Sequence, residues 1–256
     1  RERGRPIAAH RTSDTDSALG VNTRADLFEA QRRAHERILI VHALGGVTFT
    51  APDTVAIDAG VEIGPDTTIE AGVTLRGTTT IGSGATIGPQ TTITDSSVGD
   101  GVRMPHSFLL AAQVGDRATI GPFAYLRPGA VIGEGAKIGT FVEIKNSTIG
   151  ARTKVPHLSY LGDADVGEDT NIGAGNVTAN YDGARKHRTK IGKRVKTGVD
   201  TTFVAPVSVG DDAYTGAGSV IREDVPDGAL GISRPKEQGN VEGYSERKRA
   251  EQETEE

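Results

Sequence analysis

An aliphatic residue that recurs about every six positions is the feature that most constrains the fold. A period of six fits neither the 3.6-residue turn of an α-helix nor the two-residue alternation of a half-buried strand. It suits a coil of short strands that has three sides and buries one residue per side. The recurring positions are Ile57, Ile63, Ile69, Leu75, Ile81, Ile87, Ile93, Val98, Met104, Leu110, Val114, Ile120, Leu126, Ile132, Ile138, Ile144, Ile149, Val155, Leu161, Val166, Ile172, Ile191, Thr197, Phe203, Val209, Thr215 and Ile221.

These positions predict an all-β fold of about nine triangular coils, each of about 18 residues, stacked at the usual strand spacing of about 4.8 Å. The composition agrees, because 34 glycines suit tight corners and an aromatic content of 4% suits a thin core. Chance spacing in a valine-rich β protein is the alternative, and so many near-regular steps disfavour it.

The pattern resembles the hexapeptide-repeat family, whose fold is a left-handed parallel β-helix. The left hand is implied by this resemblance alone. The usual crossover rule for parallel strands would instead give a right-handed coil.

The rest of the chain divides around this coil. Residues 1–22 lead into a linker over 23–50, in which residues 23–44 are expected to form an α-helix. Thr23 and Asp26 have the spacing of a capping box, with Asp in place of Glu. The coil is expected over 51–233 with an inserted loop over 173–190, because the repeat lapses there. Residues 234–256 are rich in charge and are expected to form a flexible tail.

Composition excludes several classes of function. The chain has no cysteine, which excludes disulfides, thiolate metal sites and a cysteine nucleophile. No apolar run approaches the roughly 20 residues that span a membrane, and we expect a cytoplasmic protein. Its net charge is −5, and no aromatic residues interleave its basic run, so no nucleic-acid partner is expected. The six histidines are too scattered for a zinc hydratase site.

Three groups of residues suggest chemistry. Arg127 and Lys145 are 18 positions apart, so they are expected to lie side by side on neighbouring coils, where they could hold a phosphate or simply be exposed. His157 shares a stretch with Tyr160, Asn171 and Asn180, yet a lone histidine is more often a surface residue. The predicted loop leads into a basic run that fits either an anionic ligand or a solvated surface: Arg185, Lys186, His187, Arg188, Lys190, Lys193, Arg194 and Lys196.

The ordered motifs LRPGAVIGEGAKIGTFVEIKNSTIG, HLSYLGDADVG, NIGAG, NYDG, APVSVG, AGSVI and ISR resemble a more specific family. This family is the acetyltransferase half of the bacterial bifunctional enzymes that act as glucosamine-1-phosphate N-acetyltransferase and N-acetylglucosamine-1-phosphate uridyltransferase. Residues 1–22 resemble the end of the uridyltransferase domain. The resemblance implies an acetyl-CoA-dependent acetyltransferase of UDP-N-acetylglucosamine synthesis. It also implies a homotrimer with sites between subunits.

The resemblance also assigns roles to individual residues. His157 would be the general base, assisted by Asn180. The sugar phosphate would be held by Arg127, Lys145, Tyr160, Asn171 and Lys186. The acetyl-CoA site would be lined by Ala174, Asn180, Tyr181, Val199, Ala217 and Arg234, with the Tyr181 backbone N–H as an oxyanion donor. Acetyl-CoA would be a co-substrate, and acetyl transfer would need no further cofactor.

Two departures from the family pattern matter. Val199 stands where the family has a serine, so a hydroxyl on the acetyl-CoA side is missing unless Thr201 or a bound water replaces it. Asn22 matches a ligand of the Mg²⁺ that only the uridyltransferase reaction needs, but its carboxylate partner and the glycine-rich nucleotide loop are missing from the sequence. We therefore expect no uridyltransferase activity from the chain as given. A non-catalytic β-helix that serves oligomerisation or regulation is the alternative to an enzyme.

Overall fold

The computed structural model describes residue 11 and residues 19–233. Most of the segment 1–22 and all of the predicted tail over 234–256, including Arg234, therefore lie outside the described residues. None of the helices within the described part is long and apolar enough to cross a membrane.

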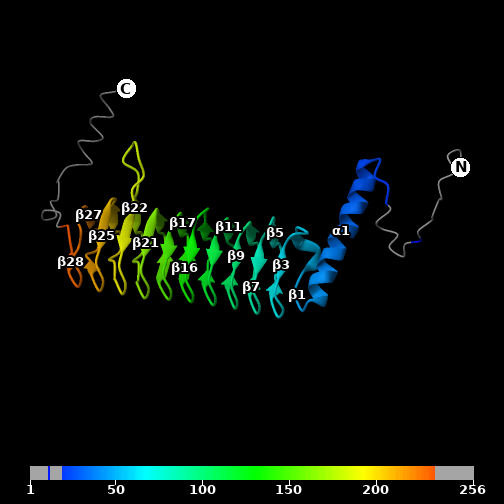
Figure 1. The fold of residues 1–256 in the computed structure, drawn as a ribbon, viewed down its shortest axis with the longest axis horizontal. Coiled ribbons are helices and arrows are strands. Elements are labelled where there is room, and N and C mark those ends of the chain that lie inside the picture. The colour runs from blue at the N-terminus through cyan, green and yellow to red at the C-terminus, as the bar shows by residue number, and fades with distance from the viewer. Residues whose placement is uncertain (1–10, 12–18, 234–256) are drawn as a thin grey trace, which may run out of the picture.

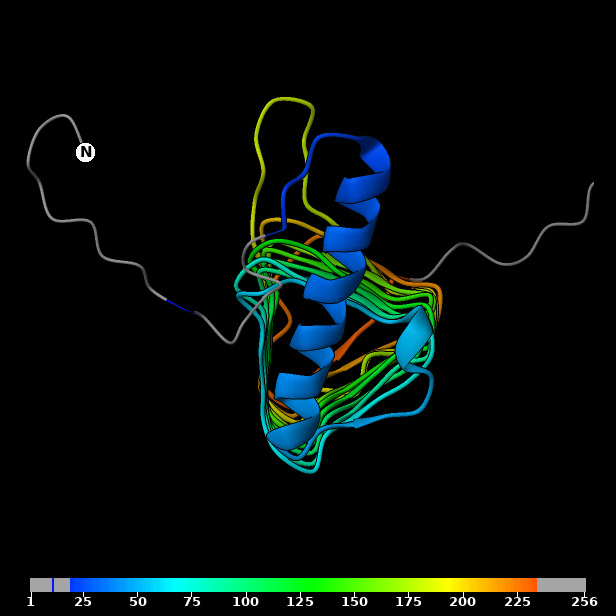
Figure 2. The same ribbon diagram turned by 90° about the vertical axis from the view of Figure 1, so that its right-hand side faces the viewer.

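The predicted helix is present as α1 (Arg24–Leu44), and its capping box is confirmed. Thr23 Oγ1 accepts a hydrogen bond from the Asp26 backbone N–H at 3.2 Å, and the Asp26 carboxylate accepts one from the Thr23 N–H at 2.8 Å. The helix lies across the first coil and closes that end of the core (Figures 1 and 2), where Ile38 and Leu39 pack against it.

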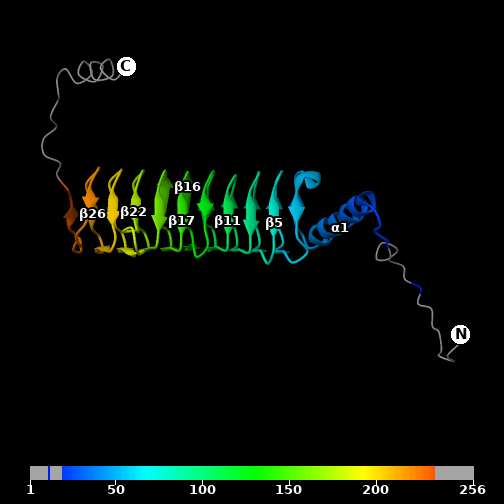
Figure 3. The same cartoon turned by 90° about the horizontal axis from the view of Figure 1, so that it is seen from above.

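Behind the helix the chain forms a triangular prism with three faces, each a sheet of parallel strands (Figures 2 and 3). The first face has seven strands, followed by a two-stranded continuation: β1 (Thr48–Phe49), β4 (Thr68–Ile69), β7 (Thr86–Ile87), β10 (Arg103–Met104), β13 (Thr119–Ile120), β16 (Lys137–Thr140) and β19 (Lys154–His157), then β26 (Tyr214–Thr215) and β28 (Leu230–Gly231). A short 3-10 helix, η2 (Pro52–Thr54), precedes the second face.

The second face has ten strands: β2 (Ala56–Ile57), β5 (Thr74–Arg76), β8 (Thr92–Thr94), β11 (Phe108–Leu110), β14 (Tyr125–Leu126), β17 (Glu143–Lys145), β20 (Tyr160–Gly162), β22 (Val177–Ala179), β24 (Thr202–Val204) and β27 (Val220–Ile221). The third face has nine: β3 (Glu62–Ile63), β6 (Thr80–Ile81), β9 (Ser97–Val98), β12 (Gln113–Val114), β15 (Val131–Ile132), β18 (Thr148–Ile149), β21 (Ala164–Val166), β23 (Thr189–Ile191) and β25 (Val207–Val209). The predicted coil of parallel strands is thus confirmed.

The core is a column of stacked side chains, most of them aliphatic, one from each side of each coil. Leu126 and Ile144, for example, are fully buried and pair directly across β14 and β17. One predicted inward position is wrong: Leu109 is fully buried, whereas Leu110 is only partly buried. The reason is that the step from Met104 is five residues, because this coil is shorter than its neighbours.

Small polar residues take the inward positions beside the corners, which explains why so modest a hydrophobic content suffices. The hydroxyl of Thr67, which is fully buried, donates to the Gly82 carbonyl at 2.8 Å and accepts from the Ala85 N–H at 3.0 Å. Such bonds satisfy buried backbone groups and tie one coil to the next.

The predicted insertion over 173–190 is shorter than expected. The coil continues through β22, where Thr178 is fully buried, and resumes at β23. The segment that leaves the coil is therefore 180–188, a hairpin closed by an antiparallel bridge between Tyr181 and Lys186. It projects beyond the triangular outline in Figure 2. The aliphatic count missed this side of the coil because its inward residue is a threonine.

Candidate functional site

The corner between the first and second faces, here called the His157 corner, aligns four of the predicted site residues. These four are His157, Ala174, Val199 and Ala217. The residue after each of them has a positive φ: Leu158 (50°), Gly175 (72°), Asp200 (53°) and Gly218 (69°). Backbone hydrogen bonds link successive coils there, from Gly175 to His157 at 3.3 Å, from Asp200 to Ala174 at 2.7 Å and from Gly218 to Val199 at 2.8 Å. His157, Ala174, Val199 and Ala217 therefore form one column that follows the coil axis.

His157 begins this column at the end of β19, beside Thr140 of β16. The residue is exposed, and its carbonyl accepts a hydrogen bond from Ser159 Oγ at 2.8 Å. Among the described residues no partner hydrogen-bonds its imidazole, so both ring nitrogens remain available for a ligand or a proton.

Val199 lies two coils further along the same column with 49% of its surface exposed. Thr201, the other possible source of the missing hydroxyl, is fully buried, and its hydroxyl contacts the Gly198 carbonyl at 3.0 Å and Thr215 Oγ1 at 2.9 Å. The expectation that Thr201 could replace the family's serine is therefore wrong. The Val199 position presents only an aliphatic side chain to solvent.

The corner between the second and third faces, here called the Lys145 corner, collects the predicted phosphate ligands other than Asn171. Because Leu126 pairs with Ile144, Arg127 lies beside Lys145 on the next coil, as the 18-residue spacing predicts. Arg127 Nη1 lies 2.7 Å from Glu143 Oε1, and Lys145 Nζ lies 3.3 Å from Asp163 Oδ2.

The hairpin brings a third cation, Lys186, to this corner. The adjacent Lys145 ammonium competes for the same hydrogen-bonding space and repels a second charge, which lowers the pKa of Lys186. Three cations thus meet only two carboxylates, Glu143 and Asp163. Arg188 also lies at this corner, where it pairs with Asp165 and donates to the Asn146 carbonyl at 3.2 Å. Lys193 and Arg194 instead form ion pairs at the third corner, between the third and first faces.

Asp163 is a polar hub that the sequence analysis did not identify. The residue is 5% exposed, and its carboxylate accepts hydrogen bonds from Asn146 Nδ2 at 2.5 Å, Asn180 Nδ2 at 2.5 Å and Lys145 Nζ at 3.3 Å. Burial alone would raise the pKa of Asp163, but these three donors outweigh it and hold the pKa below its usual value. Its spacing of 18 from Lys145 and 17 from Asn180 was the signal that could have found it.

Gly162 makes room for this cluster. A Cβ at this position would lie 2.3 Å from the Tyr160 hydroxyl oxygen and 2.7 Å from Asn180 Nδ2, closer than real Cβ atoms come. The glycine therefore allows Tyr160 and Asn180 to converge beside Lys145. It brings one sugar-phosphate candidate and one catalytic candidate to the same place.

The hairpin is held in a defined shape by its own carboxylate. Asp182 accepts hydrogen bonds from the backbone of Arg185 at 2.6 Å and Ala184 at 2.7 Å and contacts His187 Nε2 at 2.7 Å, and these contacts lower its pKa. The hydroxyl of Tyr181, which is 60% exposed, donates to the Gly183 carbonyl at 2.6 Å. Arg188 anchors the far end through Nε to Asp165 at 3.0 Å.

A single chain does not bring all predicted site residues together. His157 and Asn180 lie at opposite ends of the second face, because β20 and β22 run between their two corners. Asn171 lies on the first face, bridged to Lys154 and Lys196. The candidate residues therefore form three groups on one chain.

The described residues do not assemble a metal site. Among them, no group of three or more His, Asp or Glu side chains could hold a metal ion. Asn22 is exposed just before α1, where its backbone N–H donates to the Asp26 carboxylate at 3.1 Å. Its side chain alone does not fit the predicted Mg²⁺ ligation, and no chemistry is assigned to it.

Known proteins resemble both the repeats and most of the chain. Residues 60–95 and 111–146 match the family described as bacterial transferase hexapeptide (six repeats), and residues 188–223 match the hexapeptide repeat of succinyl-transferase. The chain is 50% identical over 97% of its length to the bifunctional protein GlmU of Mycobacterium bovis (strain BCG / Pasteur 1173P2). It is 53% identical over 96% of its length to that of Mycobacterium avium (strain 104).

The chain spans about half the length of these curated relatives, 50% in both cases. A solved structure, UDP-N-acetylglucosamine acyltransferase of Francisella novicida, has a TM-score of 0.51 and covers 79% of this chain and 73% of its own, at 14% identity. At that identity it supports the fold alone. These findings confirm the resemblance implied by the motifs: the chain is a hexapeptide-repeat, left-handed parallel β-helix similar to the bifunctional protein GlmU over about half of that protein's length.

Proposed function

We propose that the chain transfers the acetyl group of acetyl-CoA to the amine of glucosamine-1-phosphate, giving N-acetylglucosamine-1-phosphate for cytoplasmic UDP-N-acetylglucosamine synthesis. The observation that carries this proposal is the column at the His157 corner, because it places a free imidazole in line with Ala174, Val199 and Ala217. A base that adjoins the predicted acetyl-CoA site is the arrangement that direct acyl transfer needs.

The chemistry requires the removal of two protons from the ammonium group and one exchange of bonds. An amine is mostly protonated at neutral pH and cannot attack a carbonyl, so His157 Nε2 or Nδ1 removes a proton from it. The amine nitrogen then forms a bond to the thioester carbon, the C–S bond breaks, and the nitrogen releases its remaining extra proton to solvent to give the neutral amide. The departing thiolate of CoA takes up the proton from the imidazolium, which restores the neutral base.

The Lys145 corner is proposed to bind the phosphate. Arg127, Lys145 and Lys186 offer charge-assisted hydrogen bonds, and Glu143 and Asp163 hold the first two in place before the ligand arrives. Tyr160 lies beside them and is proposed to contact the sugar, as is Asn171 from the first face.

A complete site needs a second copy of the chain. The base and the phosphate ligands lie at opposite ends of the second face, so one copy is proposed to supply the His157 corner and its neighbour the Lys145 corner. A cyclic trimer whose threefold axis is parallel to the axis along which the coils stack would form three equivalent sites of this kind. Such a cleft would enclose two substrates that a single thin prism leaves exposed.

The test is release of CoA thiol from acetyl-CoA with and without glucosamine-1-phosphate. The chain contains no cysteine, so a thiol reagent reads only the CoA that is released. Loss of a general base typically costs about 10²–10⁴ in rate, and His157→Ala is expected to fall in this range. His35→Ala, a change within α1, is the control and should keep its turnover.

Two outcomes would reject the proposal. No thiol release that depends on glucosamine-1-phosphate would favour the non-catalytic β-helix. A His157→Ala protein that keeps more than about a tenth of the wild-type kcat would remove His157 as the base.

A further inference from the structure

The polar hub at the Lys145 corner suggests a role that none of the predicted site residues covers. We propose that Asp163 is a positioning residue, which fixes the amide of Asn180 so that its oxygen faces the substrate. The inference rests on the proposed function, and it names the group that prepares Asn180 for that reaction.

The orientation of the Asn180 amide follows from the chemistry of its partner. An ionised carboxylate can only accept hydrogen bonds, so the atom of Asn180 that lies 2.5 Å from Asp163 Oδ2 must be the donor Nδ2. The amide oxygen then points away from Asp163. Asn180 is 8% exposed, and no donor within the described part of the chain bonds this oxygen, which leaves it for a ligand.

Asp163 is itself held on several sides. Its carboxylate also accepts from Asn146 Nδ2 at 2.5 Å and Lys145 Nζ at 3.3 Å. Its backbone N–H donates to the Lys145 carbonyl at 3.0 Å, and its carbonyl accepts from the Thr189 N–H at 3.1 Å. A carboxylate fixed in this way can fix a second side chain in turn.

Asp163 hydrogen-bonds the residues at both ends of the hairpin. Asn180 is the first residue of the hairpin, and Thr189 is the first residue after it; both bond to Asp163. Lys186, the third cation of the corner, is carried between them. Asp163 therefore controls where the hairpin starts and where it rejoins the coil.

Asp163→Asn is the sharpest test, because it keeps the shape and replaces one of the two acceptor oxygens with an NH₂ group. Asp163 Oδ2 accepts from both Asn180 and Lys145, whereas Oδ1 accepts from Asn146. The single amide oxygen of the variant cannot serve all three donors, so Asn180 is no longer held in one orientation. Asp163 has a φ of 51°, which asparagine tolerates well. Asp212→Asn is the matched control, because Asp212 has a φ of 58° and pairs with Arg194 far from the site.

We expect Asp163→Asn to lower kcat by about 10- to 100-fold, with the KM for acetyl-CoA nearly unchanged. The decisive measurement repeats the change in an Asn180→Ala background. If Asp163 acts through Asn180, the second change there costs less than about threefold in kcat, whereas a merely structural role gives the same loss in both backgrounds. Asp212→Asn should leave kcat unchanged in either one.

Asn146→Gly provides a second variant should Asp163→Asn fold poorly, because it removes one donor to Asp163 at an exposed position whose φ of 47° suits glycine. A smaller fall in kcat that vanishes in the Asn180→Ala background would support the inference. Equal losses in both backgrounds, or an unchanged kcat, would overturn it while the proposed function stands. A wild-type chain that does not acetylate glucosamine-1-phosphate would overturn both.

Discussion

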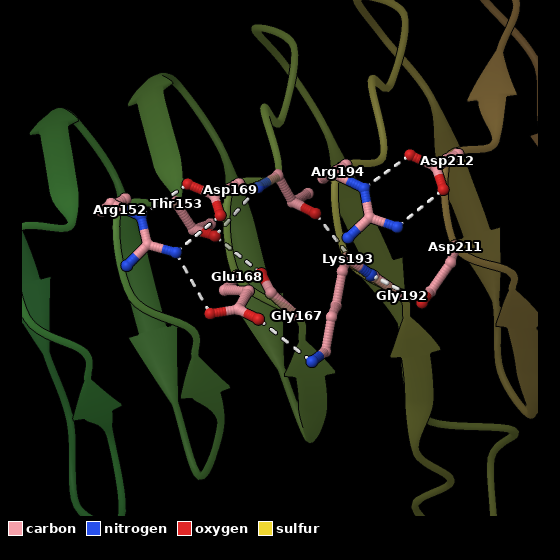
Figure 4. A network of polar contacts seen from close by, with 11 residues as sticks. Arg152, Thr153, Gly167, Glu168, Asp169, Gly192, Lys193, Arg194, Asp211 and Asp212 are labelled. Carbon is pink, nitrogen blue, oxygen red and sulfur yellow. Dashed lines mark hydrogen bonds and ion pairs between the residues drawn. The ribbon is translucent and has the colours of Figure 1, made fainter.

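The Lys145 corner and the ion-pair corner between the third and first faces are built alike but behave differently. Both stack charged residues on successive coils, and both use residues with positive φ, such as Asp163 (51°) and Arg152 (58°). At the ion-pair corner Arg152 bonds Asp169 at 2.6 Å and Glu168 at 3.1 Å, Lys193 bonds Glu168 at 3.0 Å, and Arg194 bonds Asp212 at 2.7 Å (Figure 4).

Burial and charge balance separate the two corners. The side chains of Arg152 and Arg194 are 57% and 51% exposed, and each faces a carboxylate, so the ion-pair corner is a solvated and paired ladder. The side chains of Lys145 and Asp163 are 18% and 7% exposed, and the cations there exceed the carboxylates. Partial desolvation and unbalanced charge are therefore the reasons why we propose the Lys145 corner, and not the ion-pair corner, as the ligand site.

The strongest test of this difference between the two corners compares how variants at each corner change the KM for glucosamine-1-phosphate. A hydrogen bond to a charged group contributes about 1.5–3 kcal/mol, so Lys145→Ala should raise this KM by about 10- to 100-fold. Arg152→Asn, at the ion-pair corner, should leave it unchanged. Equal effects of the two variants would show that the Lys145 corner is not the phosphate site.

Val199→Ser tests the His157 corner, where the contact in question is a neutral hydrogen bond and not a charged one as at the Lys145 corner. A recovered hydroxyl that bonds the thioester is expected to raise kcat by about 2- to 10-fold at similar KM for acetyl-CoA, as one neutral hydrogen bond allows. Val199→Ala is the control, since it shortens the side chain without adding a hydroxyl. A rise of the same size in both variants would point to space rather than to hydrogen bonding.

Acid stability distinguishes the buried hub from the exposed ladder. The folded pKa of Asp163 lies below its unfolded value of 3.8, so the unfolded chain binds more protons as the pH falls through that range, and stability is lost. The Tm of the wild-type protein should therefore fall between about pH 5 and about pH 3. We expect Asp163→Asn to reduce this fall by several degrees more than Asp212→Asn reduces it. The two variants should be compared at high salt, which screens the exposed pair. Parallel curves would contradict the distinction.

The smallest expected effect concerns the ladder itself. Arg194→Asn removes one exposed ion pair at a φ of 56°, which asparagine accepts, and it should shift Tm by less than about 3 °C. The shift should shrink further in about 0.5 M NaCl because the pair is exposed to screening. A larger shift that persists in salt would mean that the ladder stabilises the coil directly.

The sequence predicted most of the fold because its repeat is local. One inward residue every six positions specifies a coil whatever the rest of the chain does, and Ile69, Leu126 and Ile144 all lie in the core as expected. It failed where the inward residue was polar or the step changed. Thr178 hid one side of a coil inside the expected loop, and a five-residue step placed Leu109 in the core in place of Leu110.

For the site, the sequence determined which residues stack, since a coil of fixed length puts Arg127 beside Lys145. What it could not determine was burial and direction. Only the tertiary structure decided that the basic run divides between two corners, that Asp163 is buried among Lys145, Asn146 and Asn180, and that His157 lies a full face away from Asn180. The physical reason is that spacing along the chain fixes position on a coil, whereas desolvation, pairing and hydrogen-bond direction depend on all the coils packed around it.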